Sequence, residues 1–140
     1  MTGGNTYENN IVTQYLADTS KFKGDVLTPV VFMDSNSVPG SFYAEYVLYN
    51  KASDGSPEEH SHDDSDEILM FFGTDTDHPR DLCGEVELWI DGEKYTLTES
   101  AMIFVPKGVR HCPLYCRRAD RPIIMVSTAP AQYYSRDGIE

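Results

Sequence analysis

The sequence lacks the features that direct a protein into a membrane or onto a nucleic acid. Its longest apolar runs, residues 68–72 and 101–105, are far shorter than the roughly 18 residues that cross a bilayer. Residues 1–4 do not form the basic start of a secretory signal. Basic residues are few, because 11 Lys and Arg face 23 Asp and Glu, for a net charge of −12. We therefore expect a cytoplasmic protein that binds neither nucleic acid nor anionic membrane surfaces.

Cysteine is scarce, and the 3 cysteines are an odd number. On one extended strand Cys112 and Cys116 would lie about 13 Å apart, too far for a disulfide. Pro113 between them can bend the segment, so this exclusion is not complete. Cys83 is most simply a small buried residue. We expect structural, reduced thiols, which fits the cytoplasm.

Helical periodicity is rare, and short β-prone segments alternate with turn signals along one domain of 140 residues. The Asp91-Gly92 pair predicts a hairpin, and Val86, Leu88 and Ile90 share one face of the strand before it. Many short strands at intervals of about ten residues indicate an all-β sandwich or barrel. The predicted strands are 30–32, 42–49, 67–72, 85–90, 94–97, 101–105, 111–117 and 122–128.

Other segments are less regular. Residues 1–9 are polar and are expected to form a loose N-terminus. The apolar residues in 11–16 fit helical spacing and strand pairing equally, so this element stays open. Residues 73–84 are polar and predict a long loop that carries His78 on the surface; the alternative for His78 is a lid residue over the mouth of the pocket. Residues 11–16 and 30–32 offer unpaired apolar side chains, which predict a homodimer.

Histidine is also scarce, and the placement of the 4 histidines is the most informative feature of the chain. His60 and His62 stand at i and i+2, so on a strand they share one face. Glu67 follows, and His111 comes after a turn at residues 106–108. Three imidazoles and one carboxylate suit a divalent transition metal. The alternative is a set of scattered surface or core histidines.

An acidic run competes with Glu67 for the carboxylate role. Asp63, Asp64 and Asp66 lie between His62 and Glu67. Charge runs in turns are usually solvated, whereas Glu67 begins an apolar strand that can carry it inward. We therefore expect Glu67 to be the ligand and the acidic run to lie in water.

This pattern resembles the small single-domain members of the cupin superfamily. Their first motif joins His-x-His to a Glu and a later Gly, as in residues 60–73, and their second ends in Pro-x-Gly-x-x-His, as in residues 106–111. The match spans residues 55–128 of a single domain, 1–140. The departures from the pattern are at Gly55, Gly73, Ser100 and Tyr115.

The resemblance implies a double-stranded β-helix, or jelly-roll, barrel with one divalent transition metal inside it, either Fe, Mn, Ni or Zn. Four protein ligands would leave two positions for water or substrate around a six-coordinate ion. Cupins with this ligand set include dioxygenases, decarboxylases, lyases and isomerases. We expect a metal-dependent enzyme acting on a small oxygen-bearing molecule. A ligand-binding or sensing protein without turnover, and a purely structural metal, are the alternatives.

The strand at 42–49 offers candidate catalytic groups. Tyr43, Glu45 and Val47 share one face of it. If that face lines the barrel, as in cupins, Glu45 or Tyr43 can serve as an acid or base or bind substrate. The alternative is a polar face turned to solvent.

Overall fold

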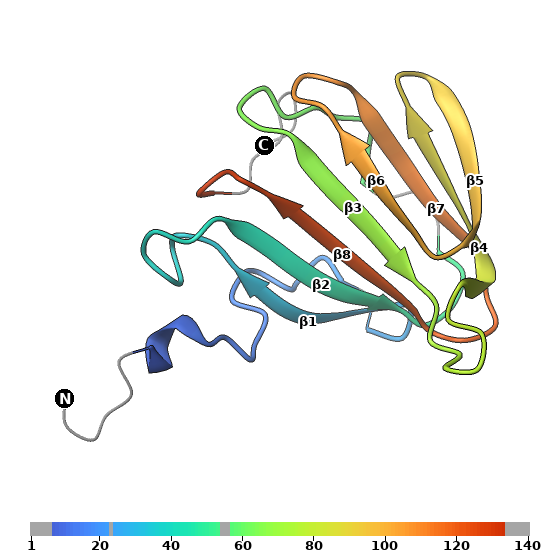
Figure 1. Cartoon of the computed structure of the whole chain (residues 1–140), viewed down its shortest axis with the longest axis horizontal. Coiled ribbons are helices and arrows are strands. Elements are labelled where there is room, and N and C mark those ends of the chain that lie inside the picture. Colours follow the sequence, from blue (N-terminus) through green and yellow to red (C-terminus); the bar gives the residue numbers. More distant parts are fainter. Residues whose placement is uncertain (1–6, 23, 54–56, 134–140) are drawn as a thin grey trace.

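The computed structural model describes residues 7–22, 24–53 and 57–133. Within them, the regular structure is one 3-10 helix, η1 (Glu8–Asn10), and antiparallel strands in two facing sheets (Figure 1). None of the described helices is long and apolar enough to cross a membrane. The strands are β1 (Leu27–Met33), β2 (Tyr43–Tyr49), β3 (Glu67–Phe72), β4 (Asp81–Ile90), β5 (Glu93–Glu99), β6 (Ala101–Val105), β7 (His111–Ala119) and β8 (Ile123–Ala129).

The larger sheet has the order β1-β2-β8-β3-β6 and the smaller one the order β5-β4-β7. Alternate residues of each strand point between the sheets and form the main core. Val86 and Leu88 of β4 are fully buried there, and Ile90 packs against them, which confirms the predicted alternation. The all-β jelly roll expected from the sequence is confirmed.

The predicted barrel is not closed. Among the described residues, hydrogen bonds within each sheet are continuous, but the sheets stay separate. Within the described part of the chain, the free edge of β7 is met only at single bridges, Ser53 with Cys116 and His60 with His111. A closed barrel needs a continuous ladder at this edge, and two isolated bridges do not supply one. The molecule is therefore a sandwich.

The apolar and turn patterns of the sequence predicted the positions of most strands, and β3 and β6 have the predicted bounds. Part of the predicted 73–84 loop is wrong, because β4 already begins at Asp81. Leu82 is fully buried, so the alternation of buried residues in β4 runs from Leu82 through Gly84 to Val86. Because the middle residue is a glycine, the sequence does not show this alternation as an apolar pattern. Gly73 is needed near this point, since a Cβ there would lie 2.0 Å from the backbone oxygen of Asp81.

The N-terminal segment is neither helix nor regular strand at residues 11–16. Tyr15 makes an isolated parallel bridge with Phe32, and its ring packs on Phe32 and Phe22. Part of the apolar content that predicted a homodimer is thus paired within the chain. Of the predicted loose terminus, residues 7–10 form a turn and η1; residues 1–6 and the motif residue Gly55 lie outside the described residues.

The outer faces of the two sheets differ in chemistry. The outer face of the smaller sheet carries charged side chains, and Arg117 and Lys94 both form ion pairs with Glu87 there. The larger sheet carries aligned apolar rows outward, and its edge residues Met102 and Phe104 are 69% and 60% exposed. We call this surface the outer apolar face; its two central rows are Phe104, Ile68, Thr128 and Ala44, and Met102, Met70, Val126 and Tyr46.

Candidate metal centre

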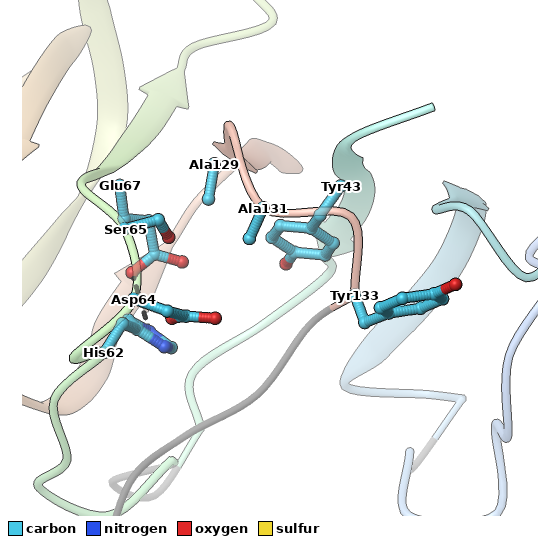
Figure 2. A pocket seen from close by; sticks show the side chains of 8 residues that line it. All are labelled: Tyr43, His62, Asp64, Ser65, Glu67, Ala129, Ala131 and Tyr133. Carbon is cyan, nitrogen blue, oxygen red and sulfur yellow. Dashed lines mark ion pairs between the residues drawn. The ribbon is translucent and has the colours of Figure 1, made fainter. Parts of the chain in front are cut away.

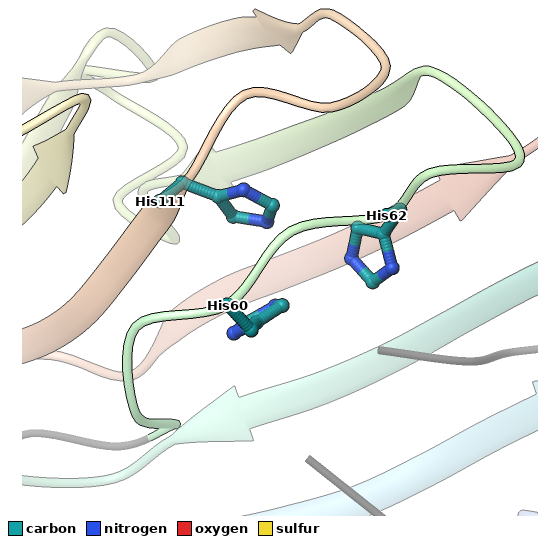
Figure 3. Close-up of side chains that lie close together, drawn as sticks. All are labelled: His60, His62 and His111. Atoms are coloured by element: carbon teal, nitrogen blue, oxygen red, sulfur yellow. The ribbon is translucent and has the colours of Figure 1, made fainter. Parts of the chain in front are cut away.

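Backbone pairing brings two histidines together from distant parts of the chain. His60 N–H donates to the carbonyl of His111 at 3.0 Å, and His111 N–H donates back to His60 at 2.8 Å. Antiparallel pairs of this kind place their side chains next to each other. Figure 3 shows both rings close to His62, and the ring centroids of His60 and His111 are 4.4 Å apart.

The Pro-Lys-Gly turn holds His62 in register with this pair. Gly108 N–H donates to the carbonyl of His62 at 2.8 Å, and Lys107 N–H donates to the Asp66 carboxylate at 2.8 Å. Gly108 has a φ of +83°, a left-handed conformation that favours glycine. The turn therefore fixes both sequence motifs against each other through backbone contacts.

An irregularity in β7 turns His111 toward the interior. Leu114 and Cys116 point inward, so strict alternation would put His111 on the opposite face. The register between β4 and β7 shifts between Leu88 and Ile90, and Cys112 has a φ of +74°. This shift resets the alternation, and His111 lies buried on the same side as Leu114.

The three histidines form a set that can hold a metal ion. All are buried, and one ring nitrogen from each lies within 4.8 Å of the others. His60 Nδ1 is 2.7 Å from the carbonyl of Glu58, and His111 Nδ1 is 3.0 Å from that of Val109. Because a carbonyl only accepts, each Nδ1 carries the hydrogen, and Nε2 of the neutral ring keeps its lone pair. This tautomer and ring orientation are typical of metal ligands.

Glu67 lies directly against two of these rings. Its Oε1 is 3.0 Å from His111 Nε2 and 3.2 Å from His62 Nε2, and its Oε2 accepts from Ser127 at 2.8 Å. Burial raises the pKa of Glu67, but when a proton lies on the His111 and His62 rings, their hydrogen bonds and the charge on His62, together with the Ser127 bond, outweigh burial and lower the pKa to about 2. The carboxylate is therefore ionised at neutral pH although its side chain is 3% exposed.

This geometry fits a cation. A neutral His111 whose Nδ1 donates to Val109 presents only a lone pair at Nε2, 3.0 Å from the Glu67 carboxylate. Two lone pairs at that distance repel, so either a proton or a metal ion has to lie between them. Ligands at right angles on bonds of about 2.1 Å stand about 3.0 Å apart, which matches the observed spacing.

The other polar residues named by the sequence are arranged as follows. Asp63, Asp64 and Asp66 are exposed, as expected, and Asp66 has a structural contact in the turn. His78 is 74% exposed and lies 3.4 Å from Asp75, which agrees with a surface position. The three cysteines are thiols and not disulfides; Cys112 and Cys116 are buried, whereas Cys83, expected to be buried, is half-buried.

The predicted face of β2 points inward and carries a polar chain to the metal site. The hydroxyls of Tyr15 and Tyr43 both contact the Glu45 carboxylate. Tyr43 also lies 3.1 Å from the Ser127 hydroxyl, which donates to Glu67. The solvent-facing alternative for Tyr43 and Glu45 is therefore wrong. Sequence reasoning missed Tyr15 and Ser127, although a serine directly after the apolar run 123–126, in the same strand, was a usable signal.

Two hollows adjoin the centre. A cavity of about 770 Å³ lies between the sheets and has His60, His111, Glu67, Ser127 and Glu45 in its wall. On the other side, a pocket of about 10 Å³ separates His62 and Glu67 from Tyr43 (Figure 2). That volume is about the space of one water. The site is thus reachable from the large cavity.

Comparison with known proteins supports the fold. No family model and no curated protein matches the sequence. Among solved structures, peruvianin-I, a cysteine peptidase from Thevetia peruviana latex, aligns at TM-score 0.62 with 14% identity over 96% of this chain and 80% of its own. A recombinant oxalate oxidase in complex with glycolate aligns at 0.57 with 17% identity, over 96% of this chain and 65% of its own.

The cupin domain of Cnp3 from Schizosaccharomyces pombe aligns at TM-score 0.50 with 11% identity, over 71% of this chain and 59% of its own. Two of these neighbours are named for different activities, a cysteine peptidase and an oxalate oxidase, so the likeness concerns architecture. Their shared architecture agrees with both histidine motifs and with the two antiparallel sheets described above. The chain has the cupin fold.

Proposed function

We propose that this protein is a metal-dependent enzyme whose single divalent ion binds His60, His62, His111 and Glu67 and takes a small oxygen-bearing molecule as a further ligand. The observation that carries the proposal is the buried contact of His111 Nε2 with Glu67 Oε1 at 3.0 Å, where a proton or a metal ion has to lie between the two atoms. Three nitrogens and one oxygen suit Fe, Mn, Ni or Zn equally, so the identity of the metal stays open.

The ligand set leaves room for chemistry. When bound, such a metal supplies a Lewis acid that polarises a carbonyl or carboxylate, or, in the case of iron, a redox centre for dioxygen. The glycolate complex of the oxalate oxidase that shares this fold supports a small oxyacid as the kind of molecule bound. The large cavity beside the histidines gives such a molecule a way in.

Glu45 and Tyr43 are proposed to move protons. Tyr43 has one hydroxyl proton and two oxygen neighbours, Glu45 and Ser127. With Glu45 ionised, Tyr43 donates to it, and the contact with Ser127 lacks a hydrogen because Ser127 donates to Glu67. With one more proton on Glu45, every contact becomes a hydrogen bond. This series of hydrogen-bonded side chains can thus hold one extra proton near the metal site.

The test begins with metal analysis of protein purified without chelators. We expect about one divalent ion per chain, and a large loss of metal in His62→Ala and His111→Ala, because the remaining ligands no longer satisfy the ion. The matched control is His78→Ala, which removes an exposed histidine. Equal metal content in all of these proteins would contradict the proposed ligands.

Turnover of candidate oxyacids then separates the possible activities. Product formed in air but not under nitrogen identifies an oxygenase, and product formed under both identifies a non-redox decarboxylase, lyase or isomerase. Tight binding without product would replace the enzyme by a ligand-binding or sensing protein.

We further propose a homodimer in which a second copy covers the outer apolar face. Two rows of mostly apolar side chains cross four strands of the larger sheet, and Met102 and Phe104 at its edge are largely exposed. An apolar surface of this kind on a soluble domain marks an interaction site. The ionic outer face of the smaller sheet offers no comparable surface among the described residues.

A further inference from the structure

The cavity beside the metal centre is much larger than a two-carbon acid. Its volume is about 770 Å³. The small pocket beside His62, at about 10 Å³, has about the space of one water, so this cavity holds many. A ligand of five non-hydrogen atoms, such as glycolate, would occupy only a small part of it. Pockets of this size usually hold ligands that bury most of their surface against apolar walls.

Polar and apolar groups are segregated along the cavity wall. The polar groups lie at the metal end and include His60, His111, Glu67, Ser127 and Glu45. The facing walls are apolar and come from both sheets. Their apolar residues include Val47 and Tyr49 of β2, Leu69 of β3, Met125 of β8, and Leu114 of β7. A ligand that fits this wall is polar at one end and apolar along its body.

The described cations at the cavity wall already have partners. Arg117 pairs with Glu87 at 2.8 Å and stacks on the Tyr115 ring at 4.1 Å. Lys21 lies over the Phe22 ring at 5.4 Å. A second anionic group on the ligand would therefore compete with existing contacts, and an uncharged body fits better.

We propose that the cavity binds an amphipathic oxyacid. Its 2-hydroxy or 2-oxo carboxylate head lies at the metal, and an uncharged aromatic or branched aliphatic body packs between Val47, Leu114 and Met125. This inference rests on the proposed function for its head group. The apolar wall specifies the rest of the molecule independently of which reaction follows.

The test uses two probes with the same head, glycolate and mandelate, which differ by one phenyl ring. Each is titrated into the full chain loaded with Co²⁺, and binding is followed by the visible absorption of the ion. Burying a phenyl ring is worth at least about tenfold in affinity, so mandelate is expected to bind at least about tenfold more tightly than glycolate.

Two variants test where the phenyl ring of mandelate lies. Val47 and Met125 are register partners on β2 and β8, so both line the same part of the cavity. In Val47→Ala and Met125→Ala the preference for mandelate is expected to fall at least about threefold, with glycolate affinity little changed. Val126→Ala is the matched control, since Val126 neighbours Met125 but belongs to the outer apolar face.

The outcomes separate the two proposals. If glycolate perturbs the Co²⁺ spectrum and mandelate binds no better, the amphipathic ligand is wrong and the proposed metal-site function stands. A preference for mandelate that survives in both Val47→Ala and Met125→Ala would also overturn the proposed amphipathic ligand, because the phenyl ring would then lie elsewhere. If Co²⁺ binds but neither acid alters its spectrum, or if Co²⁺ does not bind, both proposals fail.

Discussion

Replacing Glu67 by Gln separates metal binding from folding, because metal affinity is expected to fall sharply while the metal-free chain still folds. In the metal-free protein the buried carboxylate faces His111 Nε2 and His62 Nε2 at 3.0 and 3.2 Å. A Gln amide can donate a hydrogen to one of these lone pairs, which the ionised carboxylate cannot do. The variant should therefore still fold when no metal is present, and lose only the pH-dependent contribution of the ionised carboxylate.

Metal affinity should fall sharply in the same variant. Glu67→Gln exchanges an anionic oxygen for a neutral one, and changes even to residues that only support metal ligands cost about 10- to 100-fold in affinity. A 100-fold loss removes about 2.7 kcal/mol of metal-dependent stabilisation, or about 10 °C of the rise in Tm that metal produces in a domain of this size.

The assay compares thermal unfolding of wild type and Glu67→Gln, each with and without saturating Zn²⁺, alongside competition with a chromophoric chelator. The control is a triple Asn variant at positions 63, 64 and 66, which removes three exposed carboxylates. It should keep its metal affinity, apart from a small change from lost charge. If the triple variant loses metal and Glu67→Gln keeps it, the ligand role belongs to the acidic run.

Three further outcomes are expected. Because the pKa of Glu67 is lowered from 4.5 to about 2 in the metal-free fold, its contribution to stability is fully present above about pH 4.5 and is lost as the pH falls through about 2. Urea unfolding across this range should show it in wild type and not in Glu67→Gln. Gly73→Ala should destabilise the fold by at least about 2 kcal/mol, since its Cβ would meet backbone, whereas Gly24→Ala, with nothing within 4 Å, should cost much less. The protein should scatter light as a dimer, and the double substitution Met102→Gln with Phe104→Gln should shift it toward the monomer mass of 15.8 kDa; a wild-type monomer at micromolar concentration would contradict the outer apolar face as an interface.

Several features follow from the sequence because they depend on neighbours along the chain. The Asp91-Gly92 turn has φ values of +50° and +80°, which that pair adopts at low cost. The bounds of β3 and β6 follow from short apolar runs between turns. The spacing of His60 and His62 and the turn before His111 were sufficient to indicate one metal site of three histidines, and these three gather in the fold.

Other features depend on packing between segments far apart in sequence. The inward orientation of His111 results from a register shift between β7 and β4, so strict alternation along β7 does not predict it. The polar chain from Tyr15 through Glu45 and Tyr43 to Ser127 joins the N-terminal segment, β2 and β8, which no local pattern connects.

The sequence by itself thus determined the strands, the turn chemistry and the types of metal ligand, since a residue's preference for a conformation or an ion is a local property. The tertiary structure decided which side chains meet, how the sheets stay open as a sandwich, and how large a cavity lies beside Glu67 and His111. Cavity size depends on the distance between two sheets, and that distance is set by all the side chains packed between them.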